Sequence, residues 1–183
     1  MNMPVRNRSH SVYQQRGLSL FMVMMILIVL SILGVTAIQG ATFSARIASN
    51  EADRTLAFQS AEAALRDAEK DIAGTCTGST CRSTPIAPET ADIFEATCAL
   101  GLCLPNATTP VWEDSANWTT TGRSATYGQF TGAAALPVVS QQPQYLIEYF
   151  KLGESFVYRV SAKGFGASNS TQVMLQSSVK AFK

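Results

Sequence analysis

"LSLFMVMMILIVLSILGVTAI" occupies Leu18–Ile38 and is the most hydrophobic stretch of this 183-residue chain. It lies within 28 consecutive residues, Leu18 to Ala45, that carry no charge. About 20 apolar residues are enough for a helix to cross roughly 30 Å of hydrocarbon, whereas the core of a secretory signal usually has only about 7–15. The sequence therefore predicts a membrane-spanning hydrophobic helix over residues 18–45.

The charges on either side of this run predict its orientation. Arg6, Arg8 and Arg16 precede it without any acidic residue, whereas acidic and basic residues mix after it. Since positive charge is retained on the cytoplasmic side, we expect residues 1–17 to be a short cytoplasmic leader and the rest to lie outside. Three of the 14 basic residues are in this leader, which leaves 11 against 13 acidic ones. That balance indicates no electrostatic footprint for nucleic acid.

Residues 46–73 are predicted to continue the helix with one apolar face. They contain no Pro or Gly and are rich in Ala, Leu, Glu and Arg, which favour helix. Phe58, Leu65 and Ile72 recur every seven residues, as expected of an amphipathic helix. Smaller or nearby residues widen this stripe: Leu56, Ala61, Ala64 and Ala68. Gly74 is the expected C-terminal cap of one continuous helix.

Residues 74–143 form a variable loop region for which the sequence predicts no regular structure. The region holds six of the seven prolines and two C-x4-C pairs, Cys76/Cys81 and Cys98/Cys103. No histidine follows the leader to complete a zinc site, so two disulfides in an oxidising compartment are favoured. Four cysteines allow three pairings, and pairing within each motif is the preferred one. Trp112 and Trp118 are expected to pack this region onto a sheet.

Residues 144–183 show the period of two that is typical of strands. "QYLIEYF", "FVYRVSAKG" and "TQVMLQSSVKAF" alternate apolar and polar side chains and are separated by Gly-containing loops. This pattern predicts an antiparallel meander with one buried face. The apolar stripe of residues 46–73 is the only long candidate to cover that face. The predicted fold is therefore α+β, a long N-terminal helix packed on a C-terminal antiparallel sheet, with a disulfide-stapled loop region.

Three stretches give the chain a resemblance to a known family. "QQRG" ahead of the apolar run, "RIASNEADRTLAFQSAEAALRDAE" (Arg46–Glu69) and "YRVSAKGFGASNSTQVMLQSSV" (Tyr158–Val179) are similar to both ends of the PilX-type minor pilins of type IV pili. The resemblance implies a type IV pilin fold and a structural, non-catalytic subunit. Such a subunit would help to initiate pilus assembly at or near the tip and support adhesion and twitching motility.

The same resemblance implies a processing step and a set of partners. Prepilin peptidase would cut between Gly17 and Leu18, and Leu18 would become the N-methylated N-terminus. Other minor and major pilins would contact the apolar helix, alongside the inner-membrane assembly platform and a tip adhesin. The chain would lie in the bacterial inner membrane with a periplasmic head, and on the pilus at the cell surface after assembly.

Met22 departs from the family pattern. Most pilins have Glu at the fifth mature position, where it is thought to meet the amine of a neighbouring subunit. The fifth residue after Gly17 is Met22, and no acid occurs before Glu51. The subunit that caps the type II secretion pseudopilus also lacks this Glu. The departure favours a position at or near the tip.

Alternative functions remain open from the sequence. The chain could be a type II secretion pseudopilin, a domain secreted after cleavage at Ala37, or an uncleaved membrane-anchored periplasmic binding domain. An enzyme is disfavoured because no His outside the leader could form a Ser-His or Cys-His dyad, and no phosphate-binding loop occurs. Neither a cofactor nor a metal is expected, although Glu113, Asp114 and Asn117 are conceivable calcium ligands.

Overall fold

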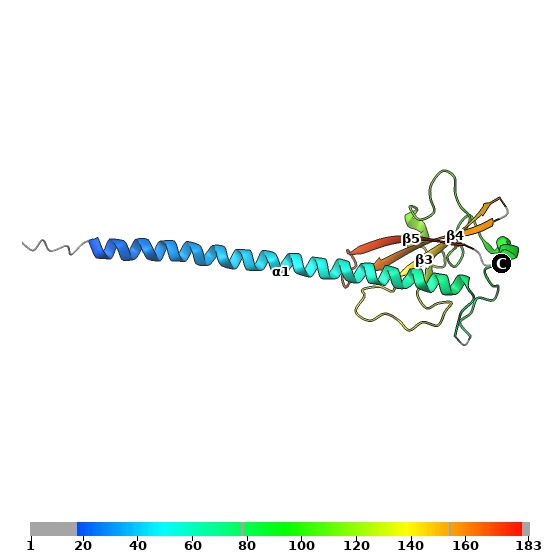
Figure 1. The fold of residues 1–183 in the computed structure, drawn as a ribbon, viewed down its shortest axis with the longest axis horizontal. Helices are drawn as coiled ribbons and strands as arrows, with labels where there is room; N and C mark the ends of the chain where they lie inside the picture. Colours follow the sequence, from blue (N-terminus) through cyan, green and yellow to red (C-terminus); the bar gives the residue numbers. More distant parts are fainter. Residues whose placement is uncertain (1–17, 78, 154, 181–183) are drawn as a thin grey trace, which may run out of the picture. The chain divides into compact units, whose positions relative to one another are not determined.

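The computed structural model describes residues 18–77, 79–153 and 155–180. The chain divides between Ala48 and Ser49 into two compact units, each treated by itself below. The expected leader, residues 1–17, lies outside the described residues. One long helix comes first, followed by a loop region and then by the long strands, which Figure 1 shows in order of colour from blue to red.

Helix α1 spans Leu18–Ile72, the range that the sequence predicts. Its end is built by Gly74, whose φ of +65° few other residues tolerate. The N–H of Gly74 donates to the Asp71 carbonyl at 3.1 Å, and the N–H of Thr75 donates to the Lys70 carbonyl at 2.8 Å. These two bonds form a Schellman motif, so the prediction that Gly74 caps the helix is confirmed.

Three long antiparallel strands form the sheet. They are β3 (Gln144–Leu152), β4 (Ser155–Phe165) and β5 (Gln172–Lys180). Strand β4 lies between the other two. Along β5 half-buried and exposed residues alternate strictly, as the period of two predicts. The meander predicted for the C-terminal part is confirmed.

The loop region adds short elements that the sequence did not predict. Strand β1 (Leu102–Cys103) pairs in parallel with β3, and β2 (Ala125–Thr126) pairs with β3 in antiparallel fashion. The sheet is therefore mixed and has five strands. The loop region also contains two short helices, η1 (Pro88–Ile93) and α2 (Ser115–Thr119).

The second half of α1 covers one face of the sheet with small residues. Ala57, Ala61, Ala64 and Ala68 are fully buried, whereas Phe58 remains 44% exposed. The sequence-based stripe is thus right for Ala61, Ala64 and Ala68 and wrong for Phe58, and it did not include Ala57. The reason lies at Gly164 on β4, where a Cβ atom would come within 2.3 Å of the Ala57 carbonyl oxygen and of the Ala61 nitrogen. So close an approach leaves room only for small side chains.

The other face of the sheet is covered as well, so the prediction of a single buried face is wrong. Leu146 on β3 packs there against Cys98, Cys103, Val111 and Trp118, with Trp112 half-buried beside them. The alternate residues of β3 and β4 face α1 and form the main core with its alanines. The expectation that Trp112 and Trp118 pack the loop region onto the sheet is confirmed.

Candidate assembly surface

Residues 18–48 present an almost continuous apolar surface. Every large apolar side chain from Leu18 to Ile47 is between 52% and 70% exposed. By length and composition this helix can cross a membrane, and its most apolar window has a mean hydropathy of 2.9 and no buried residue. Exposed apolar area on this scale is rare on soluble monomers and marks contact with lipid or with other proteins.

Three of the five hydroxyl side chains on this surface bond within their own helix. Ser31 donates to the Leu27 carbonyl at 2.7 Å. Thr36 and Thr42 each donate at 2.9 Å to the carbonyl three residues earlier. An unpaired hydroxyl is unfavourable in an apolar medium, so these internal bonds make the surface compatible with hydrocarbon or with a tightly packed bundle.

No carboxylate interrupts the start of this surface. The first turn of α1 contains no acidic residue, and Met22 is exposed there like its neighbours. The first charge along the helix is Arg46. Residues 18–45 therefore carry no charged side chain, and this part of the surface associates through apolar packing.

In the unit that starts at Ser49, the loop region is held by two disulfides. Cys76 is joined to Cys81 and Cys98 to Cys103, with Cα–Cα distances of 5.3 and 4.3 Å. This is the pairing that the sequence favours. The two bridges differ in setting, because Cys98 and Cys103 are buried in the core of the second sheet face whereas the first bridge lies near the surface.

A buried carboxylate ties the first disulfide loop to α1. Asp71 accepts hydrogen bonds from Arg82 at 2.8 and 2.9 Å and from the Tyr145 hydroxyl at 2.8 Å. Arg82 also donates to the Leu100 carbonyl and stacks 3.7 Å from the centre of the Phe130 ring. Burial, together with the charge of Asp71 and the bond to it, raises the pKa of Tyr145. The Tyr145 phenol therefore stays protonated and donates to Asp71.

Asp67, which lies one turn before Asp71 on α1, ties a second loop to the helix. It accepts a hydrogen bond from the Gly128 N–H at 2.7 Å and another from the Thr131 hydroxyl. Both aspartates are almost completely buried. The sequence pattern assigned neither of them to the buried face, because helical periodicity marks apolar residues and gives no signal for a buried acid whose partners lie far along the chain.

The second sheet face has its own ion pair. Arg159 on β4 binds Glu148 on β3 through two hydrogen bonds of 2.7 and 2.6 Å, and the two residues are directly paired in the ladder. The bond to Glu148 raises the pKa of Arg159, opposed by partial burial. The fully buried Glu148 side chain is thereby neutralised across the strands.

The conceivable calcium ligands serve the local structure instead. Asp114 accepts a hydrogen bond from the Ala116 N–H at 2.9 Å and caps α2, while Asn117 donates to the Val111 carbonyl at 2.8 Å. Among the described residues no group of three or more His, Cys, Asp or Glu side chains is arranged for a metal. The structure gives no support for a calcium site at this position.

Two family models match the chain, and together they contain both the apolar surface and the long strands. The PilX N-terminal model matches residues 16–66, and the model of the type IV pilus assembly protein PilX C-terminal region matches residues 99–181. The chain belongs to the PilX family of type IV pilus assembly proteins. This family consists of structural pilus subunits and is not an enzyme family. Comparison with curated proteins and with solved structures finds no significant match.

As a PilX-family pilin, the chain is a component of type IV pilus assembly. The N-terminal match includes the entire apolar surface, and the C-terminal match includes β1 to β5. Between the two matches lie residues 67–98, which contain the first disulfide and the 3-10 helix η1. The family-specific sequence thus coincides with the apolar helix and the sheet, and not with the first stapled loop.

Proposed function

We propose that this PilX-family chain is a minor pilin that is inserted at or near the tip of a type IV pilus and helps to initiate its assembly. The observation that carries the proposal is the apolar surface of residues 18–47, whose large side chains are 52–70% exposed. Its role is to associate with other helices, and no chemical reaction is required of it.

The membrane interior and a bundle of helices in the filament are similarly apolar surroundings for this surface. Moving some 20 apolar residues from lipid into a bundle of helices is nearly neutral in hydrophobic free energy, because both surroundings are apolar. Exposing the same residues to water would be prohibitive at about 25 cal/mol per Å². The helix is therefore transferred directly from the inner membrane to the filament, where other minor and major pilins replace the lipid.

We infer processing from the resemblance to prepilins, whose leader is cut just ahead of the apolar helix. Cleavage by prepilin peptidase between Gly17 and Leu18 would remove the basic leader and leave the apolar helix at the very N-terminus, with Leu18 methylated. The head would be periplasmic until the inner-membrane assembly platform moves the subunit into the pilus. Gly17 lies outside the described residues, and the proposal is supported by the PilX N-terminal match, which begins at residue 16 and includes the Gly17–Leu18 bond.

The tip position rests on Met22. A subunit that joins a growing filament from below needs a carboxylate to meet the N-terminal amine of the subunit already present. Met22 and its neighbours offer none. A subunit that enters first needs no such pair, and a carboxylate kept in hydrocarbon would be unfavourable without it.

The mature N-terminus is the first test of this function. Mass spectrometry of the protein purified from its own membranes or pili should find a chain that begins with methylated Leu18. A chain that begins at Ile38 would indicate a secreted domain, and one that begins at Met1 would indicate a plain membrane anchor. Either result would contradict the proposal.

The position in the pilus needs a separate experiment. Immunogold labelling of the head should mark one end of each pilus, and a tip adhesin and other minor pilins should be co-purified with it. Uniform labelling along the shaft would contradict the tip position. Deletion of the chain should reduce piliation, adhesion and twitching; a secretion defect with normal twitching would favour a type II secretion pseudopilin instead.

A further inference from the structure

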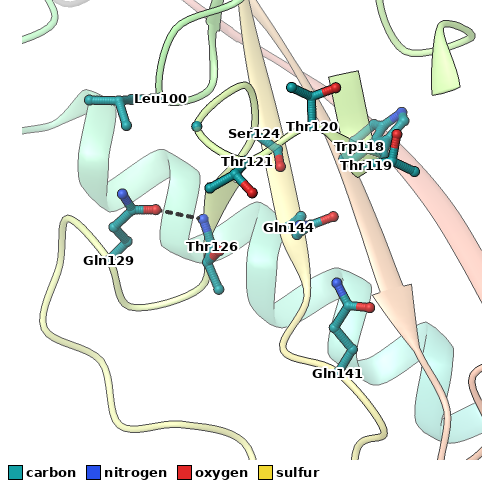
Figure 2. A pocket seen from close by; sticks show the side chains of 11 residues that line it. Leu100, Trp118, Thr119, Thr120, Thr121, Ser124, Thr126, Gln129, Gln141 and Gln144 are labelled. Carbon is teal, nitrogen blue, oxygen red and sulfur yellow. Dashed lines mark hydrogen bonds between the residues drawn. The ribbon is translucent and has the colours of Figure 1, made fainter. Parts of the chain in front are cut away.

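A polar hollow of about 660 Å³ opens between two loops of the head (Figure 2). One loop carries the second disulfide and contributes Leu100. The other begins at the end of α2 and contributes Thr119, Thr120, Thr121, Gly122 and Ser124. Main-chain hydrogen bonds join the two loops, from the Leu100 N–H to the Gly122 carbonyl at 2.6 Å and from the Gly101 N–H to the Arg123 carbonyl at 2.8 Å. The hollow is therefore built into the stapled part of the fold.

Its lining consists mainly of hydroxyl and amide side chains. No Asp, Glu, Lys or Arg is among the residues that line it. The side chains that surround it in Figure 2 include Thr120, Thr121, Ser124, Gln129, Gln141 and Gln144. This composition differs from that of most small-molecule pockets, which are lined predominantly by apolar groups with a few polar ones.

Most of the hydrogen-bonding capacity of this lining is unused. Within the described part of the chain, the side chains of Thr121, Ser124, Gln141 and Gln144 have no hydrogen-bond partner. Gln129 uses only its carbonyl oxygen, which accepts from the Thr126 N–H at 3.0 Å, as the dashed line in Figure 2 marks. Each of these side chains can both donate and accept.

Trp118 supplies the aromatic part of the wall. Its indole N–H donates to the Trp112 carbonyl at 2.9 Å, and the residue is only 6% exposed because it packs in the core of the second sheet face, so it closes the hollow from below and leaves little surface for a ligand. The Lys163 ammonium lies 5.9 Å from the centre of this ring but is not among the lining residues. The hollow therefore offers a ligand mainly hydroxyl and amide groups and little aromatic surface.

We propose that this hollow binds a neutral oligosaccharide. Sugar hydroxyls donate and accept hydrogen bonds, as do the free hydroxyl and amide groups of the lining, and the Ser124 hydroxyl belongs to a residue that is only 8% exposed yet has no partner in the described part of the chain. A charged ligand would lose its hydration without gaining a counter-charge, because the lining has none. The proposal concerns the head alone and does not depend on where the subunit sits in the pilus.

Binding is tested with the full-length protein in micelles of a zwitterionic detergent, since glucoside and maltoside detergents would compete. The probes are maltotriose, cellotriose and lacto-N-tetraose, with 3′-sialyllactose as a charged comparison, each at millimolar concentration. Saturation-transfer NMR detects the bound sugar, and tryptophan fluorescence reports on Trp118. At least one neutral sugar should bind saturably. If none of the three binds, or if only the sialylated sugar binds, the proposal is wrong.

Variants locate the site. Gln141→Ala combined with Gln144→Ala removes two free amides and should weaken binding about tenfold, as expected for two neutral hydrogen bonds. Thr121→Leu alters an exposed residue and tests the site should the double variant not fold. Gln59→Ala, an exposed amide on α1 outside the hollow, is the matched control and should bind as the unaltered protein does. Equal affinity in all variants would overturn the assignment.

Discussion

The two halves of α1 place opposite residue types on their surfaces. Residues 18–48 expose large apolar side chains and bury none, whereas the half in the head buries four alanines and two aspartates and leaves Phe58 exposed. The two halves of one continuous helix therefore differ in which residues they bury. Its first half leaves packing to lipid or to other subunits, and its second half packs within its own chain. Hydrophobicity alone does not tell which residues of a helix are inside.

The contact geometry explains the difference. In the head, β4 approaches the backbone of α1 so closely that only alanine, serine and glycine fit between them. The buried aspartates are tolerated because Arg82 and Gly128 of the loop region, together with Tyr145 on β3, donate hydrogen bonds to their oxygens. In residues 18–48 no such partner is present in the described chain, so the apolar side chains stay large and unpaired.

Val29→Asp should have the largest effect, because it would give the first half of α1 a charge without a partner. A carboxylate at the centre of the membrane is unfavourable by about 3 kcal/mol or more. We expect the variant protein to be lost from the membrane and pilus fractions in immunoblots. Val29→Leu is the control and should behave normally. Normal piliation with Val29→Asp would refute the equivalence of membrane and filament.

Asp71→Ala should have the next largest effect and tests the second half of α1. It leaves Arg82 and the Tyr145 hydroxyl without their shared acceptor in a buried site. Removing one partner of a buried ion pair lowers the free energy of unfolding by about 3–5 kcal/mol, because the other charge stays buried without a partner. Urea unfolding in micelles, followed by tryptophan fluorescence, should show this loss. Glu69→Ala, at an exposed position of the same helix, should change stability by less than about 0.5 kcal/mol.

Gly164→Ala and Gly40→Ala compare the same change in the two regions. At Gly164 the added methyl group would meet the backbone of α1, and we expect a loss of about 1–3 kcal/mol in urea unfolding. At Gly40 nothing lies within 4 Å, and replacing a helical glycine by alanine favours the helix by about 1 kcal/mol. Equal effects of the two changes would contradict the close contact in the head.

Asp53 should give the smallest effect. The pKa of its carboxyl is lowered, chiefly by a hydrogen bond from the Thr171 side chain and also by the N–H groups of Ala167 and Ser168, while burial opposes them. Because the pKa is lower in the folded state, the ionised Asp53 carboxyl stabilises the fold at pH values above the ordinary pKa of Asp, about 4. This stabilisation is lost as the pH falls through the lowered pKa. Asp53→Asn should therefore lower the free energy of unfolding slightly at neutral pH, where the gain is fully present, and remove this residue's share of the pH dependence below about 4; urea unfolding at pH 7 and pH 3 measures both effects.

Local patterns were enough to predict the elements that local physics determines. The uncharged run, the helix-favouring composition up to Ile72 and the Gly74 cap predicted α1, and period-two alternation predicted the three long strands. The structure of the loop region could not be predicted, because it depends on contacts with residues that are distant in the sequence. Strand β1 exists only beside β3, and Asp71 is buried only because Arg82 and Tyr145 reach it.

Of the two candidate surfaces, one could be predicted from local sequence and the other could not. The apolar surface of residues 18–47 could be predicted from composition, since nothing else in the chain resembles it. The polar hollow could not, because Leu100, Gln129 and Gln144 are brought together by two loops and a strand that are far apart in sequence. No spacing of Thr and Gln residues in the sequence signals such an arrangement.

The contact at Gly164 also has a mechanical meaning for a fibre that is pulled. Where main chain lies directly on main chain, no layer of long side chains is present that could slide or compress under load. Tension that reaches Ala57–Ala61 would pass into the sheet with little slack, so the head would resist shear at this point rather than yield gradually.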